Sequence, residues 1–467
     1  MPSSDAASAA LADAAPRLFW LDREDAPEPA PPLEGDAEAD LAIVGGGFTG
    51  LWAALLAKEA EPARDVVLLE AETCGFGASG RNGGFLEASL THGLSNGLAH
   101  FPREIDRLLA LGRENLARIA ATTDRHAIDA RFEPVGAIAV ATRPHEVAWL
   151  REEAELLREH GEDAVFLERD AVRAEVDSPT YLAGAWQRSN VALVDPGRLA
   201  WGLRRASLDL GVRLHERTRV ERIGEAGAGV ELRTPAGRLH ARRVVLASGV
   251  YPPLVREIRR YVAPVYDYVL VTEPLGERLR ELGWRGRQGV ADSGNRFHYY
   301  RLTDDDRIVW GGYEAVYRFG GPVAAHYDSD DATHRLLAGN FLRTFPQLEG
   351  IRFTHRFGGA IDTSSRFCAF FGTKLGGRLA YVAGYTGLGV GATRFGARVA
   401  LGLVDGTLGD LAALELVRRK PAPYPPEPLR WPTIQLTRRA LARADERGGR
   451  RGPWLRLLDR LGVGFDS

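Results

Sequence analysis

Short apolar runs along this chain stop abruptly at glycines, and a helical pattern of apolar residues follows them. Residues 42–44 end at Gly45, and an apolar helical segment begins after Gly50. Residues 379–383 end in the same way at Gly384 and precede a helical pattern over 392–403. A short, fully apolar run joined to a helix by a glycine turn is typical of a buried parallel strand. The pattern therefore predicts an α/β fold.

A different pattern predicts a second structural unit. Residues 136–140 and 164–167 are short strand-like runs, and the charged segment 146–160 between them has the spacing of an amphipathic helix. From 261 to 345, aromatic and β-branched residues alternate with polar ones. This period of two predicts antiparallel strands with one face free to cover a ligand. Core packing explains most of the aromatic residues, and we expect one or two of them to line a pocket.

The two ends of the chain differ in composition from the rest. Residues 1–39 are rich in alanine, proline and acidic residues and offer little apolar surface to bury. We expect this segment to be mobile, except that residues 18–21 pack back on the surface. Beyond Asp410 the chain is rich in proline and then basic and helical at 437–443 and 454–461. We expect these helices to pack on the protein body, and a membrane-surface helix is the alternative.

Charge and cysteine content exclude several classes of function. The formal net charge of −2 provides no bulk attraction to nucleic acid or to an anionic membrane, and we expect no nucleic-acid partner. Cys74 and Cys368 are too few for a disulfide framework or a zinc site, so we expect free thiols and no metal. Residues 1–15 lack a basic leader before an apolar core, and no stretch approaches the ~20 apolar residues of a membrane span. The expected location is cytoplasmic.

The glycines after the first strand form a nucleotide-binding pattern. Gly45, Gly47 and Gly50 satisfy G-x-G-x-x-G, in which glycines permit a tight turn, close approach to a pyrophosphate and close packing of helix on strand. An ordinary loop is the alternative for these glycines alone. Glu70 ends the next apolar run 20 residues after Gly50, where a carboxylate accepts both hydroxyls of an adenosine ribose. A carboxylate at this place also repels a 2′-phosphate, which argues against NADP.

A second glycine-dense segment follows at residues 74–84 and contains Arg81 and Asn82. Because such a segment leaves its backbone N–H groups exposed, it is suited to bind an anion or the edge of a flavin ring. A flexible loop without a ligand is the alternative, and the embedded polar side chains argue against it.

The combination of residues 44–50, Glu70 and the segment 77–84 resembles the FAD-dependent D-amino-acid-oxidase-like oxidoreductases, and within them the gamma-glutamylputrescine oxidoreductase branch. The resemblance covers about residues 40–410. It implies a Rossmann-like FAD-binding domain of glutathione-reductase type, discontinuous in sequence, with an antiparallel-sheet substrate domain and noncovalent FAD. The implied division is a mobile segment at 1–39, an FAD-binding domain at 40–125, 186–255 and 351–410, a substrate domain at 126–185 and 256–350, and a C-terminal helical extension at 411–467.

By this resemblance, the FAD contacts come from several parts of the chain. The backbone at Val220 contacts the adenine, and Ser248 and Gly249 form a second turn on the nucleotide side. The loop and helix start at 384–390 face the pyrimidine side of the isoalloxazine, where a positive helix end stabilises anionic reduced flavin. The predicted cofactor-binding residues are Gly45, Gly47, Phe48, Thr49, Gly50, Glu70, Ala71, Gly77, Ala78, Ser79, Arg81, Asn82, Gly83, Gly84, Val220, Ser248, Gly249, Gly384, Thr386, Gly387, Leu388, Gly389 and Val390.

The monomeric sarcosine oxidase pattern directs attention to the aromatic strands. Its two basic residues for a substrate carboxylate fall on Gly84 and Gly391 here, which implies a larger site with less positive charge. Its tyrosine is retained as Tyr299, its histidine falls on Glu314, and its oxygen-activating lysine falls on Trp310. We predict Tyr299, Trp310 and Glu314 as the catalytic residues, with Glu314 beside aromatic rings as a cation-binding group. A solvated strand residue is the alternative for Glu314.

The remaining departures from that pattern concern the flavin itself. The cysteine that attaches flavin falls near Ala360, and Cys368 is displaced from it, so noncovalent FAD is expected. None of Lys58, Lys374 and Lys420 matches the oxygen-activating lysine. Either an arginine or a histidine replaces it, or the electron acceptor is not oxygen.

The resemblance implies an FAD-dependent oxidoreductase that removes a hydride from the carbon next to an amine nitrogen, after which water hydrolyses the imine. The expected substrate is a small-molecule amine of gamma-glutamylputrescine or polyamine type, or another primary or secondary amine. The expected acceptor is O2 or another oxidant. Two alternatives stay open: an FAD-dependent amino-acid or amine dehydrogenase that uses a quinone or carrier, and an FAD-containing binding or tailoring protein without oxidase activity.

Overall fold

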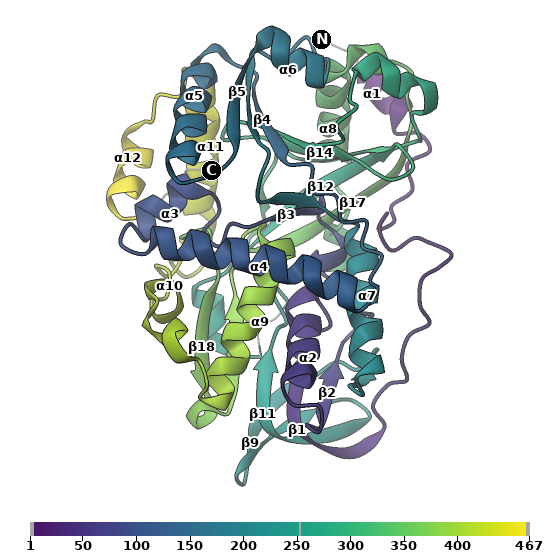
Figure 1. Ribbon diagram of the computed structural model, residues 1–467, viewed down its shortest axis with the longest axis vertical. Coiled ribbons are helices and arrows are strands. Elements are labelled where there is room, and N and C mark those ends of the chain that lie inside the picture. The colour runs from purple at the N-terminus through teal and green to yellow at the C-terminus, as the bar shows by residue number, and fades with distance from the viewer. Residues whose placement is uncertain (1–3, 252–253, 464–467) are drawn as a thin grey trace.

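The polypeptide forms two lobes that lie one above the other along the long axis of the molecule (Figure 1). The computed structural model describes residues 4–251 and 254–463. Residues 1–3 of the leading segment, 252–253 of the second predicted FAD-binding stretch and 464–467 of the predicted extension lie outside the described residues. Each lobe is built around its own sheet.

The lower sheet in Figure 1 is mostly parallel. Its order is β18-β19-β11-β1-β2-β8, and β10 and β9 continue it antiparallel from β11. The pairs β19–β11, β11–β1, β1–β2 and β2–β8 are parallel, as expected for strands connected through helices. The strands are β1 (Gly35–Val44), β2 (Val66–Leu69), β8 (Arg213–His215), β9 (Arg222–Ala226), β10 (Gly229–Arg233), β11 (Gly237–Leu246), β18 (Phe370–Lys374) and β19 (Leu379–Ala383).

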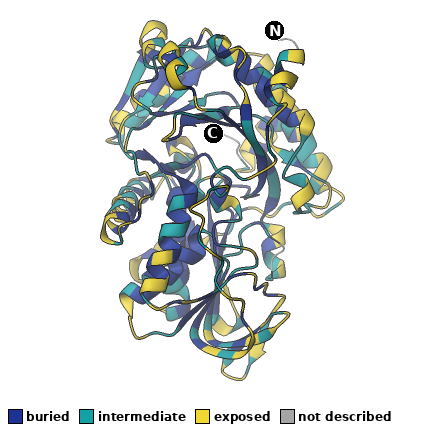
Figure 2. Ribbon diagram, turned by 90° about the vertical axis from the view of Figure 1, so that its right-hand side faces the viewer, coloured by how far each residue is buried: buried dark blue, intermediate teal, exposed yellow. Residues whose placement is uncertain are grey.

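Helices α2 (Phe48–Ala60), α7 (Pro196–Asp209) and α9 (Gly389–Asp405) cover one face of this sheet. Alternate residues of β1 point to opposite faces. Leu41 and Ile43 belong to the core under these helices, whereas Ala42 and Val44 belong to the core on the other face. Both faces are covered at the carboxyl end of β1, where residues 41–44 are all buried, whereas residues 35, 36 and 38 at its start are exposed. Figure 2 shows the buried stretches in dark blue and the exposed ones in yellow.

The upper sheet has the order β16-β12-β15-β14-β13-β4-β6-β5, with β17 paired to β12. Its pairs are antiparallel except for β13–β4, which is parallel. Helices α8 (Asp331–Thr344) and α1 (Ser4–Ala10) pack on its outer face, and α5 (Pro144–Glu159) packs on β5 and β6. The strands are β4 (Ala137–Ala141), β5 (Ala164–Glu168), β6 (Ala183–Gln187), β12 (Ala263–Thr272), β13 (Gly289–Asp292), β14 (His298–Leu302), β15 (Ile308–Gly312), β16 (Val316–Tyr317) and β17 (Phe353–Thr363).

A small ribbon and several helices connect the two lobes. The antiparallel ribbon consists of β3 (Phe85–Glu87) and β7 (Val191–Leu193), and α4 crosses the molecule between the lobes (Figure 1). The remaining helices are α3 (Leu94–His100), α4 (Ile105–Arg125), α6 (Arg169–Glu175), α10 (Glu415–Arg418), α11 (Arg430–Glu446) and α12 (Pro453–Arg460).

The predicted fold class is confirmed: a discontinuous Rossmann-like sheet accompanies a largely antiparallel second sheet. One boundary differs from our assignment. Strand β17 lies in the 351–410 stretch that we gave to the FAD-binding domain, but it pairs along its length with β12 of the upper sheet. The hydrophobic pattern identifies a strand but not its partner, because β12 lies far away in the sequence. The other domain boundaries remain our proposal.

The leading segment is packed rather than mobile. Ala7 and Ala10 of α1 belong to the core of the upper lobe, and Trp20 is 2% exposed in a cluster with Val269 and Val309. This confirms that residues 18–21 pack back on the protein. For the other residues of the leading segment, the prediction of mobility from composition was wrong. Composition averages over the whole segment, whereas a few apolar side chains that pack on an apolar surface suffice to order it.

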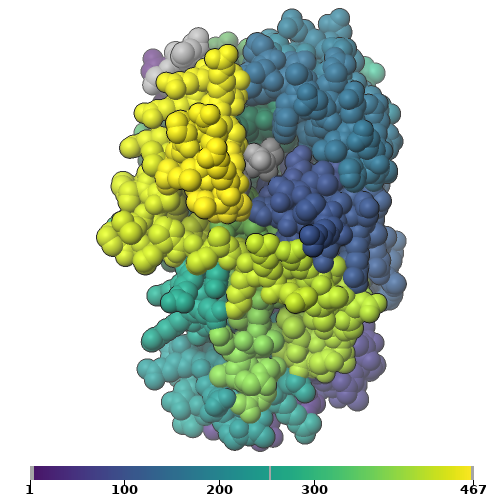
Figure 3. Space-filling view, turned by 90° about the vertical axis from the view of Figure 1, so that its left-hand side faces the viewer, coloured from purple at the N-terminus to yellow at the C-terminus, as the bar shows by residue number. Residues whose placement is uncertain are grey.

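The C-terminal helices also pack on the protein body, as expected. Leu455 of α12 is fully buried, and α11 contacts both α12 and β16. In Figure 3 the C-terminal segment, in yellow, lies against the upper lobe. Within residues 4–251 and 254–463, no helix combines the length and the apolar character needed to cross a bilayer.

Candidate active site

A cavity of about 1020 Å³ lies between the two lobes. Its lining includes residues at the carboxyl ends of β1, β2, β11 and β19 of the lower sheet, and residues of β12 and β14 of the upper sheet. In open α/β sheets, ligands bind outside the carboxyl ends of the strands. The cavity therefore occupies the place where this fold binds a nucleotide and can bring it against the upper sheet.

Glycine is needed for a different structural reason at each of the three positions of the first motif. Gly45 has φ +109°, and a Cβ there would lie 2.5 Å from the carbonyl oxygen of Ala247. A Cβ on Gly50 would overlap the carbonyl oxygen of Gly45. Gly47 lines the cavity, and its Cβ would meet only the Ser79 hydroxyl, at 3.0 Å. Gly45 and Gly50 thus hold α2 close to β1, and Gly47 keeps the cavity wall open.

The start of α2 is free to bind an anion. Its N-cap is Gly47, and no side chain caps the helix. The first N–H groups of a helix lack partners within the helix and carry partial positive charge, which favours a phosphate. One exception is the Phe48 N–H, which donates to Ser79 Oγ at 2.9 Å.

Glu70 lies at the cavity wall at the end of β2. Its Oε2 accepts the Gly46 N–H at 2.5 Å, and its Oε1 accepts the Glu72 N–H at 2.8 Å. Burial raises the pKa of this carboxyl, and the two backbone N–H groups oppose that shift. The backbone thus orients a carboxylate with further lone pairs available for the hydroxyls of a ribose.

The polar side chains of the segment 77–84 shape the loop itself. Asn82 Nδ2 donates to the carbonyls of Ala78 and Ser79, each at 2.9 Å, and Asn82 Oδ1 accepts the Gly84 N–H at 2.8 Å. Arg81 donates from Nη1 to the Gly358 carbonyl at 2.9 Å and pairs with Asp328 at 2.6 Å. Both side chains therefore fix the loop on the cavity wall.

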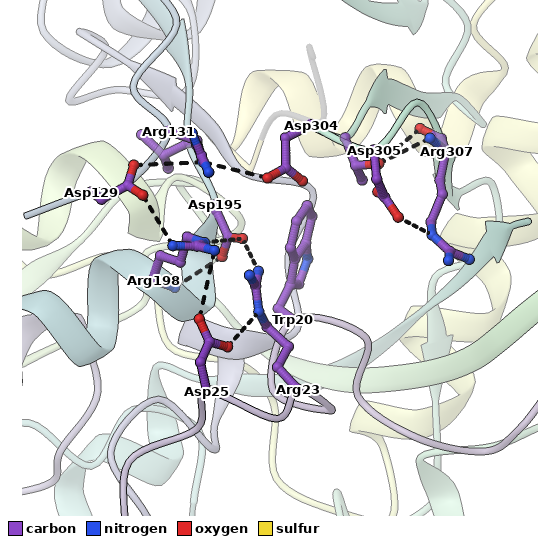
Figure 4. Close-up of polar contacts among 12 residues, drawn as sticks. Trp20, Arg23, Asp25, Asp129, Arg131, Asp195, Arg198, Asp304, Asp305 and Arg307 are labelled. Carbon is purple, nitrogen blue, oxygen red and sulfur yellow. Dashed lines mark hydrogen bonds and ion pairs between the residues drawn. The ribbon is translucent and has the colours of Figure 1, made fainter. Parts of the chain in front are cut away.

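The leading segment supports this loop from behind. Trp20 Nε1 donates to the Asn82 carbonyl at 2.8 Å. Three residues later, Arg23 pairs with Asp195 at 2.7 Å and with Asp25 at 3.0 Å. Figure 4 shows this ion-pair network, which continues through Arg198 to Asp129. Asp195 caps α7 by accepting the Arg198 N–H, at 2.9 Å.

Replacing Trp20 by alanine is expected to weaken FAD retention. The substitution removes a 2% exposed indole and the donor to the loop, with a cost of about 3 kcal/mol in the free energy of unfolding. Thermal unfolding followed by the release of flavin fluorescence measures this effect. Trp20→Phe keeps a ring without the N–H and should lose about 1 kcal/mol. An unchanged FAD dissociation constant in Trp20→Ala would contradict the supporting role.

A second open helix start faces the cavity at α9. Its N-cap is Leu388, without a side-chain cap, and Thr386 to Val390 line the cavity. Asp362 Oδ2 accepts the Gly384 N–H at 2.6 Å, and burial raises the pKa of Asp362 to about 6. Sequence reasoning missed Asp362, because its link to the loop depends on β17 joining the upper sheet.

The predicted cofactor residues meet around this cavity, with three exceptions. Gly50, Gly84 and Gly384 are absent from its lining and act through backbone packing. Two uncapped helix starts, a ribose-type carboxylate and a glycine-walled cavity between them fit FAD. The residues that line it are Gly45, Gly47, Phe48, Thr49, Glu70, Ala71, Gly77, Ala78, Ser79, Arg81, Asn82, Gly83, Val220, Ser248, Gly249, Thr386, Gly387, Leu388, Gly389 and Val390.

Tyr299 lies on the cavity side of the upper sheet. Its ring fills the space over two glycines, since a Cβ on Gly83 or Gly311 would lie 2.7 or 2.5 Å from it. Its hydroxyl donates to Asp267 Oδ2 at 2.6 Å. Asp267 also accepts the N–H groups of Tyr268 and Gly312, at 2.9 and 3.1 Å. Burial raises the pKa of Asp267 to about 6.

Trp310 does not line the cavity, which corrects its prediction as a catalytic residue. β14 and β15 pair Tyr299 with Gly311 and Tyr300 with Trp310. Because alternate residues of a strand face opposite ways, Trp310 and Tyr300 share the outer face. There the Trp310 ring packs on Phe341 of α8 at 5.4 Å, and Trp310 is fully buried.

Glu314 lines the cavity, but the chain itself supplies its cations. Its carboxylate accepts a hydrogen bond from Arg438 of α11 and pairs with Arg296 at 3.7 Å. Arg438 also lines the cavity, so the C-terminal helix forms part of the wall. This geometry assigns the negative charge of Glu314 to holding α11 in place, and its role toward substrate remains a proposal.

Gly84 and Gly391 do not enlarge the cavity, contrary to our expectation. Neither lines it. A Cβ on Gly84 would overlap the Val194 carbonyl, and a Cβ on Gly391 would overlap the Glu87 carbonyl. Backbone carbonyls occupy the space beside both glycines, so other side chains set the space available to substrate.

Other cavity residues went unrecognised in the sequence. Glu87 ends β3, Glu153 lies on α5, and His92 follows the β3 segment. His92 has φ +59°, and burial lowers the pKa of its imidazole. The strand pattern and the helix pattern of these segments gave no signal for them, because only the tertiary fold turns them toward the cavity.

Neither cysteine and none of the three lysines lines the cavity. Cys74 and Cys368 are buried in the core of the lower lobe. Lys58 donates to the carbonyls of Pro62 and Arg64, and Lys374 and Lys420 pair with Glu257. This agrees with the expectation of noncovalent FAD.

The fold and the site together define a dinucleotide-binding flavoprotein with a separate substrate-covering sheet. Residues 40–401 match the family profile described as FAD dependent oxidoreductase (DAO). The chain therefore belongs to the DAO family of FAD-dependent oxidoreductases, and its cofactor is FAD.

Known relatives agree with this assignment. The chain is 33% identical over 379 residues to gamma-glutamylputrescine oxidoreductase of Escherichia coli (strain K12), which covers 80% of this chain and 85% of the relative. It is 25% identical over 405 residues to the probable oxidoreductase OrdL of Haemophilus influenzae, covering 84% and 88% of the two chains. The crystal structure of glycine oxidase from Geobacillus kaustophilus matches with a TM-score of 0.67 at 24% identity, over 82% of this chain and 99% of that one.

Proposed function

We propose that this protein oxidises a C–N bond of a primary or secondary amine of polyamine type to an imine, which water then hydrolyses. The observation that carries the proposal is the charge balance of the cavity wall. Each arginine that lines the described cavity is already bound by the chain. By contrast, three lining carboxylates, those of Glu87, Glu153 and the exposed Glu221, have no side-chain hydrogen bond or ion pair among the described residues. The bound arginines are Arg81 to Asp328, Arg113 to Glu162, Arg219 to Glu72, Arg438 to Glu314, and Arg430 to backbone carbonyls.

This balance disfavours a substrate carboxylate and favours a cation. A carboxylate substrate needs an available guanidinium or ammonium to offset the cost of leaving water. The 33% identical relative named gamma-glutamylputrescine oxidoreductase supports an amine substrate, since its name describes an amine derivative. We therefore prefer an amine to an amino acid.

When bound in this cavity, FAD would supply the hydride acceptor. The chain contributes binding, orientation and exclusion of water. Gly47 and the start of α2 would hold the diphosphate of FAD, Glu70 would hold its ribose, and the loop 77–84 would lie beside its ring system. Tyr299, held by Asp267, forms the aromatic wall against which the amine is oriented.

A second candidate is a dehydrogenase that passes electrons to a quinone or another carrier. It is favoured by the absence of any lysine from the cavity lining, because a nearby cation stabilises the negative charge that develops when reduced flavin reacts with O2. His92 is poorly suited to replace such a cation, since burial lowers the pKa of its imidazole and so disfavours the charged form.

Anaerobic titration with a panel of amines and D-amino acids tests the proposal. We expect putrescine-type amines to bleach the flavin absorbance and D-amino acids to leave it unchanged. Admission of air with a peroxide assay then separates an oxidase, which releases peroxide, from a dehydrogenase, which does not. Bleaching by D-amino acids alone would reject the amine assignment, and no bleaching by any compound would favour a non-redox role.

A further inference from the structure

Two carboxylates from distant parts of the sequence meet in the cavity without a cation. Glu87 ends β3 in the connecting ribbon, and Glu153 lies on α5 of the upper lobe. Both side chains line the same cavity, and the negative charge of Glu87 contributes to the raised pKa of the Glu153 carboxyl. The two side chains therefore form a pair of like charges across the cavity, defined here as the Glu87–Glu153 pair.

Apart from the exposed Glu221, the other carboxylates that line the cavity have partners within the described chain, whereas the Glu87–Glu153 pair has none. Within the described part of the chain, neither Glu87 nor Glu153 has a side-chain hydrogen bond or an ion pair, and Glu153 Oε2 is buried without a partner. By contrast, Glu162 pairs with Arg113 at 2.7 Å and accepts from Asn190 at 2.7 Å. Burial raises the pKa of the Glu87 carboxyl, and it raises the pKa of the Glu153 carboxyl to about 7.

The position of Glu87 relates the pair to the chemistry of the site. The Glu87 backbone touches the start of α9 at Gly391, beside the helix start that faces the cofactor space. On the same strand, Phe85 meets the Tyr299 ring edge-on, with 6.1 Å between centroids. Glu87 thus lies between the start of α9 and the aromatic wall at Tyr299, which is the side of the cavity where we place the substrate.

We propose that the Glu87–Glu153 pair binds a second, protonated amino group of the substrate, remote from the C–N bond that is oxidised. This inference rests on the proposed function and specifies its substrate class as diamines and related polyamine-type cations. Two partly buried carboxylates without partners are costly unless a cation lies between them. An ammonium offers three hydrogen-bond donors for the carboxylate oxygens, and its positive charge offsets their negative charge.

The lining around the pair suits the methylene chain of such a substrate. Leu109 of α4, Leu157 of α5 and Phe85 of β3 line the same cavity. Apolar side chains between a charged anchor and an aromatic wall bind an alkyl chain by removing its surface from water. The distal ammonium then fixes how far the reacting carbon extends toward the cofactor.

The test compares the binding of 1,4-diaminobutane with that of butylamine, which has the same carbon chain and one amino group. Calorimetric titration of the holoenzyme, with its flavin reduced by dithionite under anaerobic conditions, reports binding without turnover. Wild type is expected to bind the diamine about 10- to 100-fold more tightly than butylamine, the range of a charge-assisted contact. Glu87→Gln and Glu153→Gln should each reduce this ratio to about 1, because the diamine loses the contact of its second ammonium.

Glu155→Gln is the matched control, because Glu155 is exposed on the same helix. It should retain the wild-type ratio. Equal binding of the two amines in wild type, or an unchanged ratio in both glutamine variants, would overturn the inference. Because Glu87 and Glu153 lie on different elements, either variant decides the question if the other does not fold.

Flavin reduction in the oxidised holoenzyme separates this inference from the proposed function. Selective binding of the diamine without any flavin reduction would leave the ammonium site standing and reject amine oxidation. Reduction by both amines with equal binding would retain amine oxidation and reject the ammonium site.

Discussion

Replacing Gly50 by alanine is expected to abolish FAD binding and to lower the free energy of unfolding by about 3 kcal/mol or more. The new Cβ would overlap the Gly45 carbonyl, and Ile43 Cγ2 would lie 3.3 Å away. Neither the backbone oxygen nor α2, which packs on α7 and α9, can move without opening the core. Chemical denaturation and flavin fluorescence of the purified protein measure the two effects.

Two other glycines provide controls for this result. Gly47→Ala should leave the fold intact but weaken FAD, because its Cβ would meet only the Ser79 hydroxyl, 3.0 Å away, at the cavity wall. Gly339→Ala in α8 meets nothing within 4 Å and should stabilise the protein by roughly 0.5 to 1 kcal/mol. If Gly50→Ala retained wild-type stability, the close packing of α2 on the glycine turn would not explain the motif.

Replacing Asp267 by asparagine is expected to remove a pKa of about 6 from the pH profile of flavin reduction. The ionised carboxylate accepts the Tyr299 hydroxyl, and below that pKa the protonated acid holds it less firmly. The limiting rate of reduction in wild type should therefore rise with pH through this range. The asparagine side chain also places an N–H group against the hydrogen-bond donors that the carboxylate accepted. The limiting rate of flavin reduction above pH 6 should therefore fall on the order of 10- to 100-fold.

Tyr299→Phe distinguishes this mechanism from a general loss of stability. The hydrogen bond from Tyr299 lowers the pKa of Asp267, so its removal should move the apparent pKa upward from about 6. Tyr300→Phe is the matched control, because Tyr300 lies on the opposite face and bonds Tyr181 at 2.5 Å. Stopped-flow reduction at saturating amine gives the limiting rate. A profile that is the same in wild type and Asp267→Asn would reject Asp267 as the positioning residue.

The cofactor half of the site was readable from the sequence because its chemistry is local. Gly45, Gly47 and Gly50 lie within one turn of chain, and Glu70 ends the neighbouring strand. Close approach of the backbone to a phosphate needs glycine at neighbouring positions of the chain, and this need is visible as a sequence motif.

The substrate-binding part of the site was predicted less well, because it depends on which face of a strand each side chain occupies. Tyr299 was placed correctly on the cavity side, but Trp310 was assigned by spacing and lies on the opposite face. A shift of one residue along a strand reverses the face that a side chain occupies. Glu314 reached the cavity, yet its pairing with Arg438 depends on a C-terminal helix whose docking no local pattern indicates.

The sequence by itself therefore determined the α/β class, the FAD cofactor and the family to which the resemblance pointed. Each follows from local periodicity, glycine spacing and the chemistry of neighbouring residues. The tertiary structure alone decided that residues 18–21 support the loop 77–84, that β17 joins the upper sheet, and that Glu87 and Glu153 meet in one cavity. These depend on contacts between segments far apart in the chain, and the free energy of such contacts comes from surfaces that exist only after folding.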